Sequence, residues 1–338
     1  MRILISSHFF APSVGGIEQV SGILAEEFVA LGHEVRVVTQ TPAAGEPAGQ
    51  PFQVFRRPAR GALFGLIRWC DVYFQSNISL ATLWPAWLLR RPVVVTYHTW
   101  LTRPDGRVGW QDRLKRLVAR FITLNLGVSR AVATSVSPRC EIIANPYRDD
   151  LFTVDPTITR DRELVFLGRL VSDKGADLLL NALAQLKAAG TTPTLTLIGT
   201  GPDEAALRAQ VEKLGLAAQV SFLGKRTGPD LVRELNRHRI IVIPSRWSEP
   251  FGLVALEGLA CGLVPLGSDD GGLVDAIGPC GVLFTRGSAE DLAAKLRDLI
   301  GQAERCSALL ARAPAHLARH GRRAVAAEYL RHFEEARA

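Results

Sequence analysis

The sequence has no apolar run long enough to cross a membrane. A spanning helix needs about 20 consecutive apolar residues, and no stretch of the 338 residues approaches that length. The apolar residues of the first segment, MRILISSHFF, are interrupted by Ser6, Ser7 and His8. We therefore expect this segment to form a strand that enters a loop, and not a signal peptide.

Several common chemical motifs are also missing. The five cysteines are scattered without a C-x-x-C pair, which favours reduced thiols in a cytosolic protein. There is no P-loop, no metalloprotease helix and no G-x-S-x-G motif. The run Gly199-Thr200-Gly201-Pro202 lacks the third glycine of a dinucleotide-binding fingerprint, so NAD binding is not expected.

The net charge of +7 is concentrated in the first half of the chain. Residues 1–139 contain 16 Lys and Arg against 8 Asp and Glu, a net charge of +8, whereas residues 140–338 contain 24 against 25, a net charge of −1. A basic half is typical of proteins that meet an anionic membrane, an anionic acceptor or nucleic acid. The alternative is that the charge serves solubility alone.

The alternation of apolar runs and amphipathic segments predicts two doubly wound, Rossmann-like α/β domains facing a cleft, the place where such proteins bind ligands. A length of 338 residues is too great for one ordinary core. The pattern breaks near Asn145-Pro146, so we expect an N-terminal domain at 1–147 and a C-terminal domain at 148–314, with a last helix at 315–338 packing back on the first domain. The expected strands are 2–7, 35–40, 52–56, 71–75, 93–98, 124–128, 141–144, 164–167, 194–198, 219–222, 240–243, 264–267 and 281–284.

The strongest chemical signal is a pair of cations just after the first strand of the second domain. That strand ends at Gly168, and Arg169 follows at its carboxyl end, where open α/β sheets bind ligands. Lys174 is expected to open the next helix, where a cation opposes the helix dipole. An anion between the two cations would relieve this conflict, with each pair at 4 Å contributing up to about 4 kcal/mol before desolvation. The alternative is that both cations pair with acids such as Asp173 or Asp177.

A second signal is a pair of glutamates, Glu249 and Glu257, which are eight residues apart. Pro250 suits a first helical turn, so we expect a helix that starts directly after Glu249 and separates the carboxylates by about 12 Å. This is roughly the distance between the two sugars of a nucleotide-sugar. The amides of Phe251–Leu253 would face the diphosphate from the helix N-terminus. The alternative is an ordinary helix with a capping Glu249 and an exposed Glu257.

With these motifs the chain resembles the family 4 retaining glycosyltransferases, which have the two-domain GT-B fold. The resemblance extends over nearly the whole chain, although Pro146-Tyr147 follows Asn145 where the family usually has Gly and a small apolar residue. The matching features are Pro12-x-x-Gly15-Gly16, Gly168-Arg169 with Asp173-Lys174-Gly175, Gly199-Thr200-Gly201-Pro202, Glu249-Pro250-Phe251-Gly252 through Glu257, and Gly271-Gly272.

The resemblance implies a catalytic set of His98, Arg169, Lys174 and Glu249. The two cations would hold the donor diphosphate and its developing negative charge. Glu249 would bond to hydroxyls of the donor sugar, and Glu257 would bond to the ribose. The sugar would be transferred with retention by attack on the same face. Such enzymes need no metal or cofactor, and the chain has no Asp-x-Asp motif.

Further donor contacts are expected from both domains. By resemblance, the Gly15 and Gly16 amides would close over the phosphates, and His98 would lie beside the donor sugar. The alternative for His98 is a strand-end histidine with its hydrogen bonds satisfied. By position, backbone groups near Lys225 and Arg226 are candidates to contact the nucleobase.

The basic half also carries the features expected of an acceptor or membrane site. Five of the six tryptophans lie there, and the segment 83–91 places two of them beside cations. One face of the helix expected at 110–122 carries Trp110, Leu114, Leu117, Val118 and Phe121, and the other carries Arg113, Lys115, Arg116 and Arg120. This composition is typical of a helix in a membrane interface. The alternative is a helix packed on its own sheet with a solvated basic face.

The expected partners are therefore a nucleotide-sugar donor, a lipid-linked or saccharide acceptor and the anionic inner face of the plasma membrane, with no nucleic acid. Two other functions stay open on the sequence. One is a nucleotide-sugar epimerase or glycan phosphorylase on the same fold, although the chain is short for a phosphorylase. The other is a non-catalytic partner that binds nucleotide-sugar.

Overall fold

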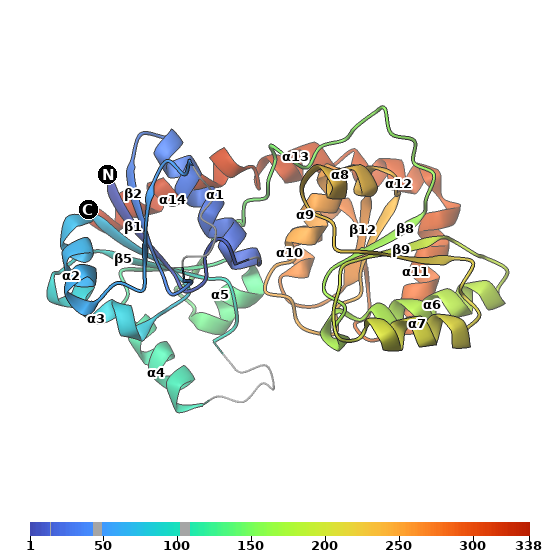
Figure 1. Ribbon diagram of the computed structural model, residues 1–338, viewed down its shortest axis with the longest axis horizontal. Helices are drawn as coiled ribbons and strands as arrows, with labels where there is room; N and C mark the ends of the chain where they lie inside the picture. Colours follow the sequence, from blue (N-terminus) through green and yellow to red (C-terminus); the bar gives the residue numbers. More distant parts are fainter. Residues whose placement is uncertain (14, 43–48, 102–108) are drawn as a thin grey trace. The chain divides into compact units, whose positions relative to one another are not determined.

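The computed structural model describes residues 1–13, 15–42, 49–101 and 109–338. The chain folds into two compact units. The N-terminal unit comprises Met1–Tyr147 and His320–Ala338, and the C-terminal unit comprises Arg148–Arg319 (Figure 1). Residues 41–51 are rich in Pro, Gly and Ala, which predicts a loop, and this segment lies in part outside the described residues.

The N-terminal unit is built on a seven-stranded sheet in which all paired strands are parallel. Every residue of β4 and β5 is buried, as a parallel sheet covered on both faces requires. The strand order is β3-β2-β1-β4-β5-β6-β7, so the chain winds in opposite directions from the boundary between β1 and β4. The strands are β1 (Arg2–Ser7), β2 (Glu34–Thr39), β3 (Gln53–Arg56), β4 (Val72–Ser76), β5 (Val93–Tyr97), β6 (Leu124–Gly127) and β7 (Glu141–Ile142).

The last helix of the chain completes the core of the N-terminal unit. Tyr329 and Phe333 are fully buried, and their rings lie 5.3 Å and 5.4 Å from the ring of Phe74 on β4. Phe28 lies 5.5 Å from Phe333. Tilted and edge-on aromatic pairs of this kind contribute about 1 kcal/mol each beyond the area they bury. The helices are α1 (Gly16–Ala30), α2 (Arg60–Trp69), α3 (Leu80–Leu88), α4 (Trp110–Ala119), α5 (Arg130–Val136) and α14 (Arg322–Arg337).

The C-terminal unit is built on a six-stranded parallel sheet with the order β10-β9-β8-β11-β12-β13. Winding reverses between β8 and β11. The strands are β8 (Leu164–Leu167), β9 (Leu195–Ile198), β10 (Val220–Gly224), β11 (Ile240–Ile243), β12 (Val264–Ser268) and β13 (Val282–Phe284). The helices are α6 (Ala176–Ala188), α7 (Glu204–Lys213), α8 (Gly228–Asn236), α9 (Leu253–Ala260), α10 (Leu273–Ile277), α11 (Ala289–Gly301), α12 (Ala303–Leu310) and α13 (Ala313–Ala318), with 3-10 turns η1 (Ser172–Lys174) and η2 (Gly278–Cys280).

The fold class predicted from the sequence, two parallel α/β units, is confirmed, and each strand lies within two residues of its expected position. The single helix expected at 315–338 is wrong. It is two helices, and α13 belongs to the C-terminal unit while α14 belongs to the N-terminal unit. The break occurs because Gly321 is extended and the His320 carbonyl accepts a hydrogen bond from the Tyr147 amide at 3.2 Å.

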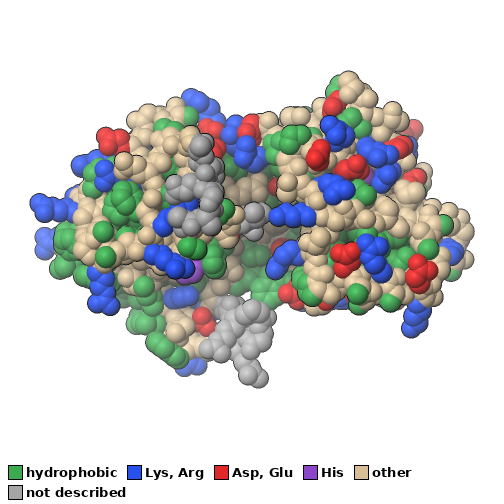
Figure 2. Space-filling model, viewed as in Figure 1, with side chains coloured by type: hydrophobic (Ala, Val, Ile, Leu, Met, Phe, Trp, Pro, Cys, Tyr) green, Lys and Arg blue, Asp and Glu red, His purple; other side chains and the backbone are tan. Residues whose placement is uncertain are grey.

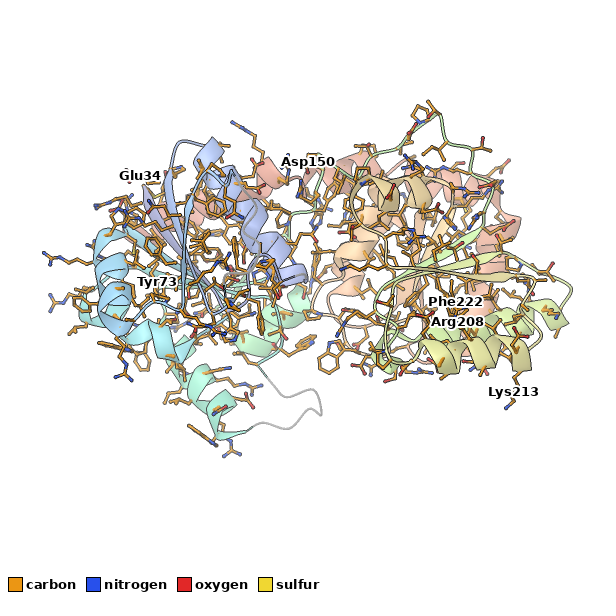
Figure 3. All side chains as sticks on the ribbon, in the orientation of Figure 1. Glu34, Tyr73, Asp150, Arg208, Lys213 and Phe222 are labelled. Carbon is orange, nitrogen blue, oxygen red and sulfur yellow. The ribbon has the colours of Figure 1, made fainter. Side chains whose placement is uncertain are left out.

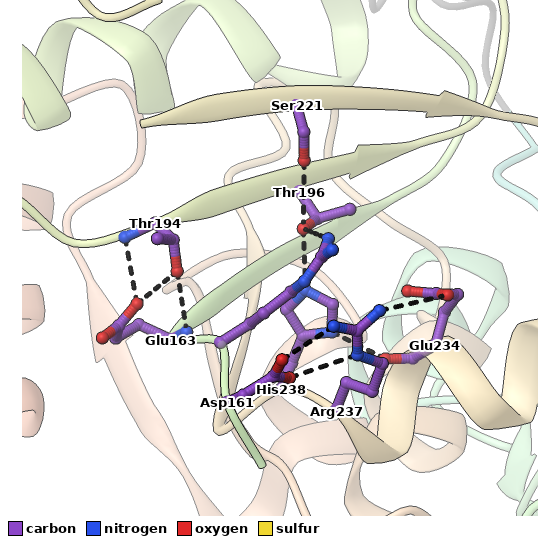
Figure 4. Close-up of polar contacts among 9 residues, drawn as sticks. Asp161, Glu163, Thr194, Thr196, Ser221, Glu234, Arg237 and His238 are labelled. Atoms are coloured by element: carbon purple, nitrogen blue, oxygen red, sulfur yellow. Dashed lines mark hydrogen bonds and ion pairs between the residues drawn. The ribbon is translucent and has the colours of Figure 1, made fainter. Parts of the chain in front are cut away.

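Polar contacts fix the amino ends of the strands in the C-terminal unit (Figure 4). The Thr196 hydroxyl lies 2.8 Å from Nε2 of His238 and accepts a hydrogen bond from Arg162 at 3.1 Å. Arg237 forms a two-point ion pair with Asp161 at 3.1 Å and 2.7 Å. At the sheet edge, the Arg208 guanidinium of α7 covers the Phe222 ring of β10 at 4.1 Å (Figure 3). Side chains thus hold the segment just before β8 and the edge strand β10 in place.

Two buried histidines make stability depend on pH. Burial lowers the pKa of His98 and of His238 from 6.5 to about 4 in the folded chain. The unfolded chain therefore binds protons first as the pH falls, so this stability is fully present above pH 6.5 and is lost toward pH 4. We predict that the free energy of unfolding falls by about 3 kcal/mol per histidine over this interval.

Urea denaturation at successive pH values measures the effect. The variant His238→Gln removes one of the two groups, so its stability should depend less steeply on pH over the same interval. An unchanged slope in this variant would contradict the assignment to His238.

Candidate functional site

The carboxyl edge of the C-terminal sheet carries most of the residues singled out in the sequence. Winding reverses between β8 and β11, and these two strands are direct neighbours. The carboxyl edge at such a switch point is the usual ligand site of an open α/β sheet. Arg169 and Lys174 follow β8, and Glu249 follows β11.

The loop after β8 exposes one cation and holds another. The Leu170 amide donates to the Thr200 carbonyl at 3.0 Å, and Leu170 itself is buried. Arg169 is exposed, and its guanidinium has no hydrogen-bond or ion-pair partner among the described residues. The alternative in which Arg169 pairs with Asp173 or Asp177 is therefore not observed. Lys174 does not open a helix, because it ends the 3-10 turn η1 and α6 begins two residues later.

Lys174 and Glu249, 75 residues apart in the sequence, form an ion pair. Nζ of Lys174 lies 2.5 Å from Oε1 of Glu249, and the Ser245 hydroxyl donates to the same oxygen at 2.7 Å. The side chains are only 26% and 12% exposed. At this degree of burial, loss of either partner would leave an uncompensated charge, which costs far more than breaking an exposed pair. The structure thus brings together two predicted donor residues and leaves the Arg169 guanidinium without an acidic partner.

A second set of contacts joins the same two loops. Arg246 forms a two-point ion pair with Asp177 at 2.5 Å and 2.6 Å, and this carboxylate raises the pKa of Arg246. The Arg246 and Trp247 amides both donate to the Asp173 carbonyl, at 2.8 Å and 3.2 Å. The loops on either side of the switch point are therefore fixed to each other by backbone and side chains.

Gly175 allows this close approach. Its φ of 69° lies in the left-handed region, and a Cβ atom placed on it would lie 2.0 Å from the Pro244 carbonyl oxygen. A side chain at this position would therefore be strained by the backbone and would also clash with the loop after β11. Gly271 has a similar role on the other side of Glu249, since its Cβ would lie 2.4 Å from the Glu249 carbonyl oxygen.

The segment between the two glutamates differs from the expected helix. Helix α9 starts at Leu253, not directly after Glu249, and its N-cap is Gly252 with a φ of 106°. Pro250 is therefore outside the helix, and the 12 Å spacing derived from a continuous helix does not apply. The left-handed glycine changes the chain direction, so Phe251 is buried and the first-turn amides begin at Leu253. The Ala255 amide donates to the carbonyl of the N-cap Gly252 at 3.0 Å, whereas the amides of Leu253 and Val254 have no carbonyl partner within the helix.

Glu257 lies in the middle of α9 and is only 9% exposed. The alternative of an exposed Glu257 is therefore wrong. Glutamate side chains are almost never this buried unless they are paired. The predicted role of Glu257 toward a ribose stays a prediction.

Two predicted donor residues lie farther along the same edge. Lys225 and Arg226 follow β10, which is separated from β8 by β9. Both side chains are exposed, and Arg226 donates to the Lys225 carbonyl at 3.0 Å. They lie at the same carboxyl edge as the loop after β8, but within the described residues no hydrogen bond or ion pair joins them to Arg169 or Lys174. Gly168, at the end of β8, lies beside the loop of Gly199, whose Cβ would clash with the Gly168 carbonyl at 1.8 Å.

The N-terminal unit holds the other predicted residues. Gly15 is the extended N-cap of α1, and Gly16 is the first residue of that helix. The Glu18 carboxylate lies over this turn, since a Cβ on Gly15 would be 2.4 Å from Oε2 of Glu18. A negative group therefore already occupies the vicinity of the amides that were predicted to contact phosphate.

His98 follows β5 and is buried. Its amide donates to Oδ1 of Asn77 at 2.7 Å, and its Nε2 has no hydrogen-bond partner among the described residues. Burial lowers the pKa of the imidazole to about 4, an effect that the side chain of Asn145 partly opposes. The ring is therefore neutral at neutral pH. The alternative of a histidine with all hydrogen bonds satisfied does not hold for Nε2.

A cavity of about 690 Å³ lies at the switch point of the N-terminal sheet, where β1 and β4 are neighbours. Ser7 and His8 line it after β1, and Asn77 lines it after β4. The same Asn77 binds the His98 amide, so His98 is one hydrogen bond from the cavity wall. Sequence reasoning missed Asn77 and Ser245 because neither is distinctive by type. Their position directly after a strand was the available signal.

The sequence profiles of two families divide the chain between them. The profile of glycosyl transferases group 1 matches residues 148–316, and that of Glycosyltransferase Family 4 matches residues 14–148. Glycogen synthase of Mycobacterium tuberculosis (strain ATCC 25618 / H37Rv) is 35% identical over 360 aligned positions, which cover 89% of this chain and 86% of that protein. The chain belongs to the family 4 glycosyltransferases. The resemblance inferred from the motifs is thereby confirmed.

Other similar family 4 proteins match over shorter regions. D-inositol 3-phosphate glycosyltransferase of Rhodococcus jostii (strain RHA1) is 37% identical over 168 residues. That alignment covers 46% of this chain and only 36% of the relative's length.

Solved structures share the fold of this family 4 chain. The crystal structure of Anabaena Alr3699/HepE in complex with UDP superposes with a TM-score of 0.83 at 20% identity, covering 99% of this chain and all of the other. Sucrose-phosphate synthase from Thermosynechococcus elongatus superposes with a TM-score of 0.76 at 20% identity, covering 99% and 98% of the two chains. At this identity the likeness establishes the two-unit fold alone.

The close approach at Gly175 generates a stability prediction. Gly175→Ala should lower the free energy of unfolding by about 3 kcal/mol or more, because left-handed strain and a clash with the Pro244 carbonyl act together. Gly190→Ala is the matched control, since Gly190 also has a positive φ, 83°, but has open space around its Cβ position. The control should lose only about 1 kcal/mol. Urea denaturation compares the two variants. If both lose the same free energy of unfolding, the close approach of Gly175 to Pro244 does not contribute to stability.

Proposed function

We propose that the chain is a retaining glycosyltransferase that transfers a hexosyl unit from a nucleoside diphosphate sugar to a hydroxyl of a lipid-linked or saccharide acceptor. The observation that carries the proposal is the charge arrangement at the C-terminal switch point. Arg169 is an exposed cation without a partner, beside a Lys174–Glu249 pair that neutralises itself. Such a site attracts a diphosphate, because the ligand supplies the missing negative charge.

The donor diphosphate lies, in this proposal, between Arg169, Lys174 and the first-turn amides of α9. Helix N-termini bind phosphates through free amides and the helix dipole. The similar structures of Anabaena Alr3699/HepE in complex with UDP and with UDP-glucose support a nucleotide-sugar donor. The names of the curated relatives, a glycogen synthase and a D-inositol 3-phosphate glycosyltransferase, support sugar transfer.

The two glutamates bind hydroxyl groups in this proposal. Glu249 is held by Lys174 and Ser245 through one carboxylate oxygen, Oε1, so its orientation is set before the donor arrives. Its other oxygen is the group that would accept from a sugar hydroxyl. Glu257, in helix α9, would accept a hydrogen bond from a ribose hydroxyl. Neither carboxylate serves as a nucleophile.

The reaction breaks the bond between the anomeric carbon and the phosphate oxygen, and the acceptor oxygen attacks on the same face. The acceptor proton passes to the leaving phosphate. Arg169 and Lys174 stabilise the charge that develops on the diphosphate. His98 is neutral at neutral pH because its pKa is about 4, so it acts on the sugar as a hydrogen-bonding group and not as a cation. The N-terminal unit binds the acceptor, and the transfer uses no metal ion or organic cofactor.

A panel of nucleoside diphosphates and nucleoside diphosphate sugars in a thermal-shift assay tests the donor class. A ligand at 100 times its dissociation constant adds about 2.7 kcal/mol of stability, so a matching donor should raise the melting temperature clearly. Product analysis with a labelled donor then separates transfer from epimerisation. Absence of any shift across the panel would contradict the donor assignment.

The variant Arg169→Ala tests the leaving-group role. Loss of a preorganised charge at a developing anion should lower kcat on the order of 10²–10³-fold. Arg297→Ala is the matched control, because Arg297 is an exposed arginine on α11. Steady-state kinetics with the donor found in the panel compares the two variants. A kcat equal to that of the wild type would remove Arg169 from the mechanism.

A further inference from the structure

Helix α4 presents its apolar side chains to solvent. Trp110 is 71% exposed, Phe121 just after the helix is 69% exposed, and Leu114 and Leu117 are 38% and 50% exposed. Within the helix, Trp110, Leu114 and Leu117 are spaced by four and three residues, so they share one helix face, and Phe121 follows four residues later, just past the helix end. Ala119 is the buried residue of the helix. The alternative of a helix with its apolar face on its own sheet is therefore wrong.

Helix α3 adds a second exposed apolar face. Trp84, Trp87 and Leu88 are 47%, 41% and 68% exposed. The ends of α3 and α4 meet at the 690 Å³ cavity, which is lined by residues of both helices. Figure 1 shows the two helices next to each other in the N-terminal unit. Trp110 and Leu114 belong to both the cavity wall and the exposed face.

These residues form an unusual concentration, which we call the α3–α4 face. Of the eleven exposed large hydrophobic residues in the described part of the chain, seven lie on α3, on α4 or directly after α4. Val154 and Val274 are the two in the C-terminal unit. Scattered exposed apolar residues need no explanation, whereas a contiguous group marks an interaction surface.

The charge of the α3–α4 face indicates what it meets. Arg113, Lys115, Arg116 and Arg120 are on α4 or at its end, and none has an acidic partner within the ranges that the structure describes. The acid of the helix, Asp112, accepts a hydrogen bond from the Gly109 amide at 2.8 Å and so serves as a cap. Hydrophobic and basic side chains appear together over α4 in Figure 2. Arg113 and Arg120 are exposed, whereas Lys115 and Arg116 are only partly exposed and Nε of Arg116 is buried. The cations that border the apolar face are therefore Arg113 and Arg120.

We propose that the α3–α4 face docks on an anionic lipid bilayer, with Trp84, Trp87, Trp110 and Phe121 at the level of the headgroups. Tryptophan prefers this interface, and unpaired Lys and Arg are attracted to acidic headgroups. No helix of the described residues has the length and apolar character to cross a bilayer. A second copy of the chain is disfavoured as the occupant, because a symmetric contact would place the same unpaired cations against each other.

Vesicle flotation tests the proposal without any donor, so its outcome is independent of the proposed transferase function. The wild type should float with vesicles of phosphatidylcholine and phosphatidylglycerol at low salt, and much less with phosphatidylcholine alone. Phe121→Asp should lower the bound fraction roughly tenfold, since it replaces an inserted ring with a repelled charge. Val154→Asp, with the same added charge at a 54% exposed site of the C-terminal unit, should bind as the wild type does.

A second pair of variants tests the charge. Arg113→Gln with Arg120→Gln should weaken flotation and its salt dependence, whereas Arg297→Gln with Arg323→Gln should not, although both pairs remove two exposed cations. Thermal melting confirms that each variant is folded. The proposal is overturned if the wild type does not float, or if Phe121→Asp floats equally well. It is also overturned if sedimentation shows a dimer that Phe121→Asp dissociates, because the face would then be a protein interface.

Discussion

The contact between the Lys174 ammonium and the Glu249 carboxylate is the interaction on which the C-terminal site depends. It joins the loop after β8 to the loop after β11, across the point where the sheet reverses its winding. Gly175 makes room for it by letting the backbone pass close to the Pro244 carbonyl, and the Arg246–Asp177 pair fixes the same two loops from the outside. Because these contacts are made within the chain itself, the two loops are held in place without a ligand, and such preorganisation would lower the cost of binding in the proposed site.

The consequence for charge is as important as the geometry. Lys174 is largely compensated by Glu249, so the local excess of positive charge rests on Arg169. A diphosphate brings more negative charge than one cation can balance. It would therefore draw on Lys174 as well, and Glu249 would then exchange part of its ion pair for hydroxyl groups of the sugar. In the chain without a ligand, Lys174 and Glu249 thus bind each other in place of the diphosphate and the sugar that they are proposed to contact.

Residue patterns predicted much of this organisation, and the misses have physical reasons. Apolar runs such as residues 93–97 predicted the buried parallel strands, because a strand that is covered on both faces needs apolar side chains on both. The start of α9 was misplaced because Pro250 is compatible with a first helical turn, while the left-handed φ of Gly252, set by tertiary packing, delays the helix. The Lys174–Glu249 pair could not be predicted by spacing, since tertiary structure alone joins residues 75 positions apart. The sequence did not predict whether the apolar face of α4 is exposed, because an amphipathic pattern does not show which helix face packs on the protein.

The two units have different surfaces that match the uneven charge of the chain. The C-terminal unit carries the Lys174–Glu249 and Arg246–Asp177 ion pairs at the carboxyl edge of its sheet. The N-terminal unit carries unpaired cations beside exposed tryptophans. Part of the basic excess of residues 1–139, namely the exposed Arg113 and Arg120, therefore lies beside exposed apolar side chains.

The most direct test of the central claim is a crystal structure of the chain with a bound nucleoside diphosphate sugar. We predict diphosphate oxygens at hydrogen-bonding distance, about 3 Å, from Arg169 and Lys174, with Glu249 on the donor sugar and Glu257 on the ribose. A diphosphate bound away from the loops after β8 and β11, with both glutamates clear of the ligand, would contradict the account.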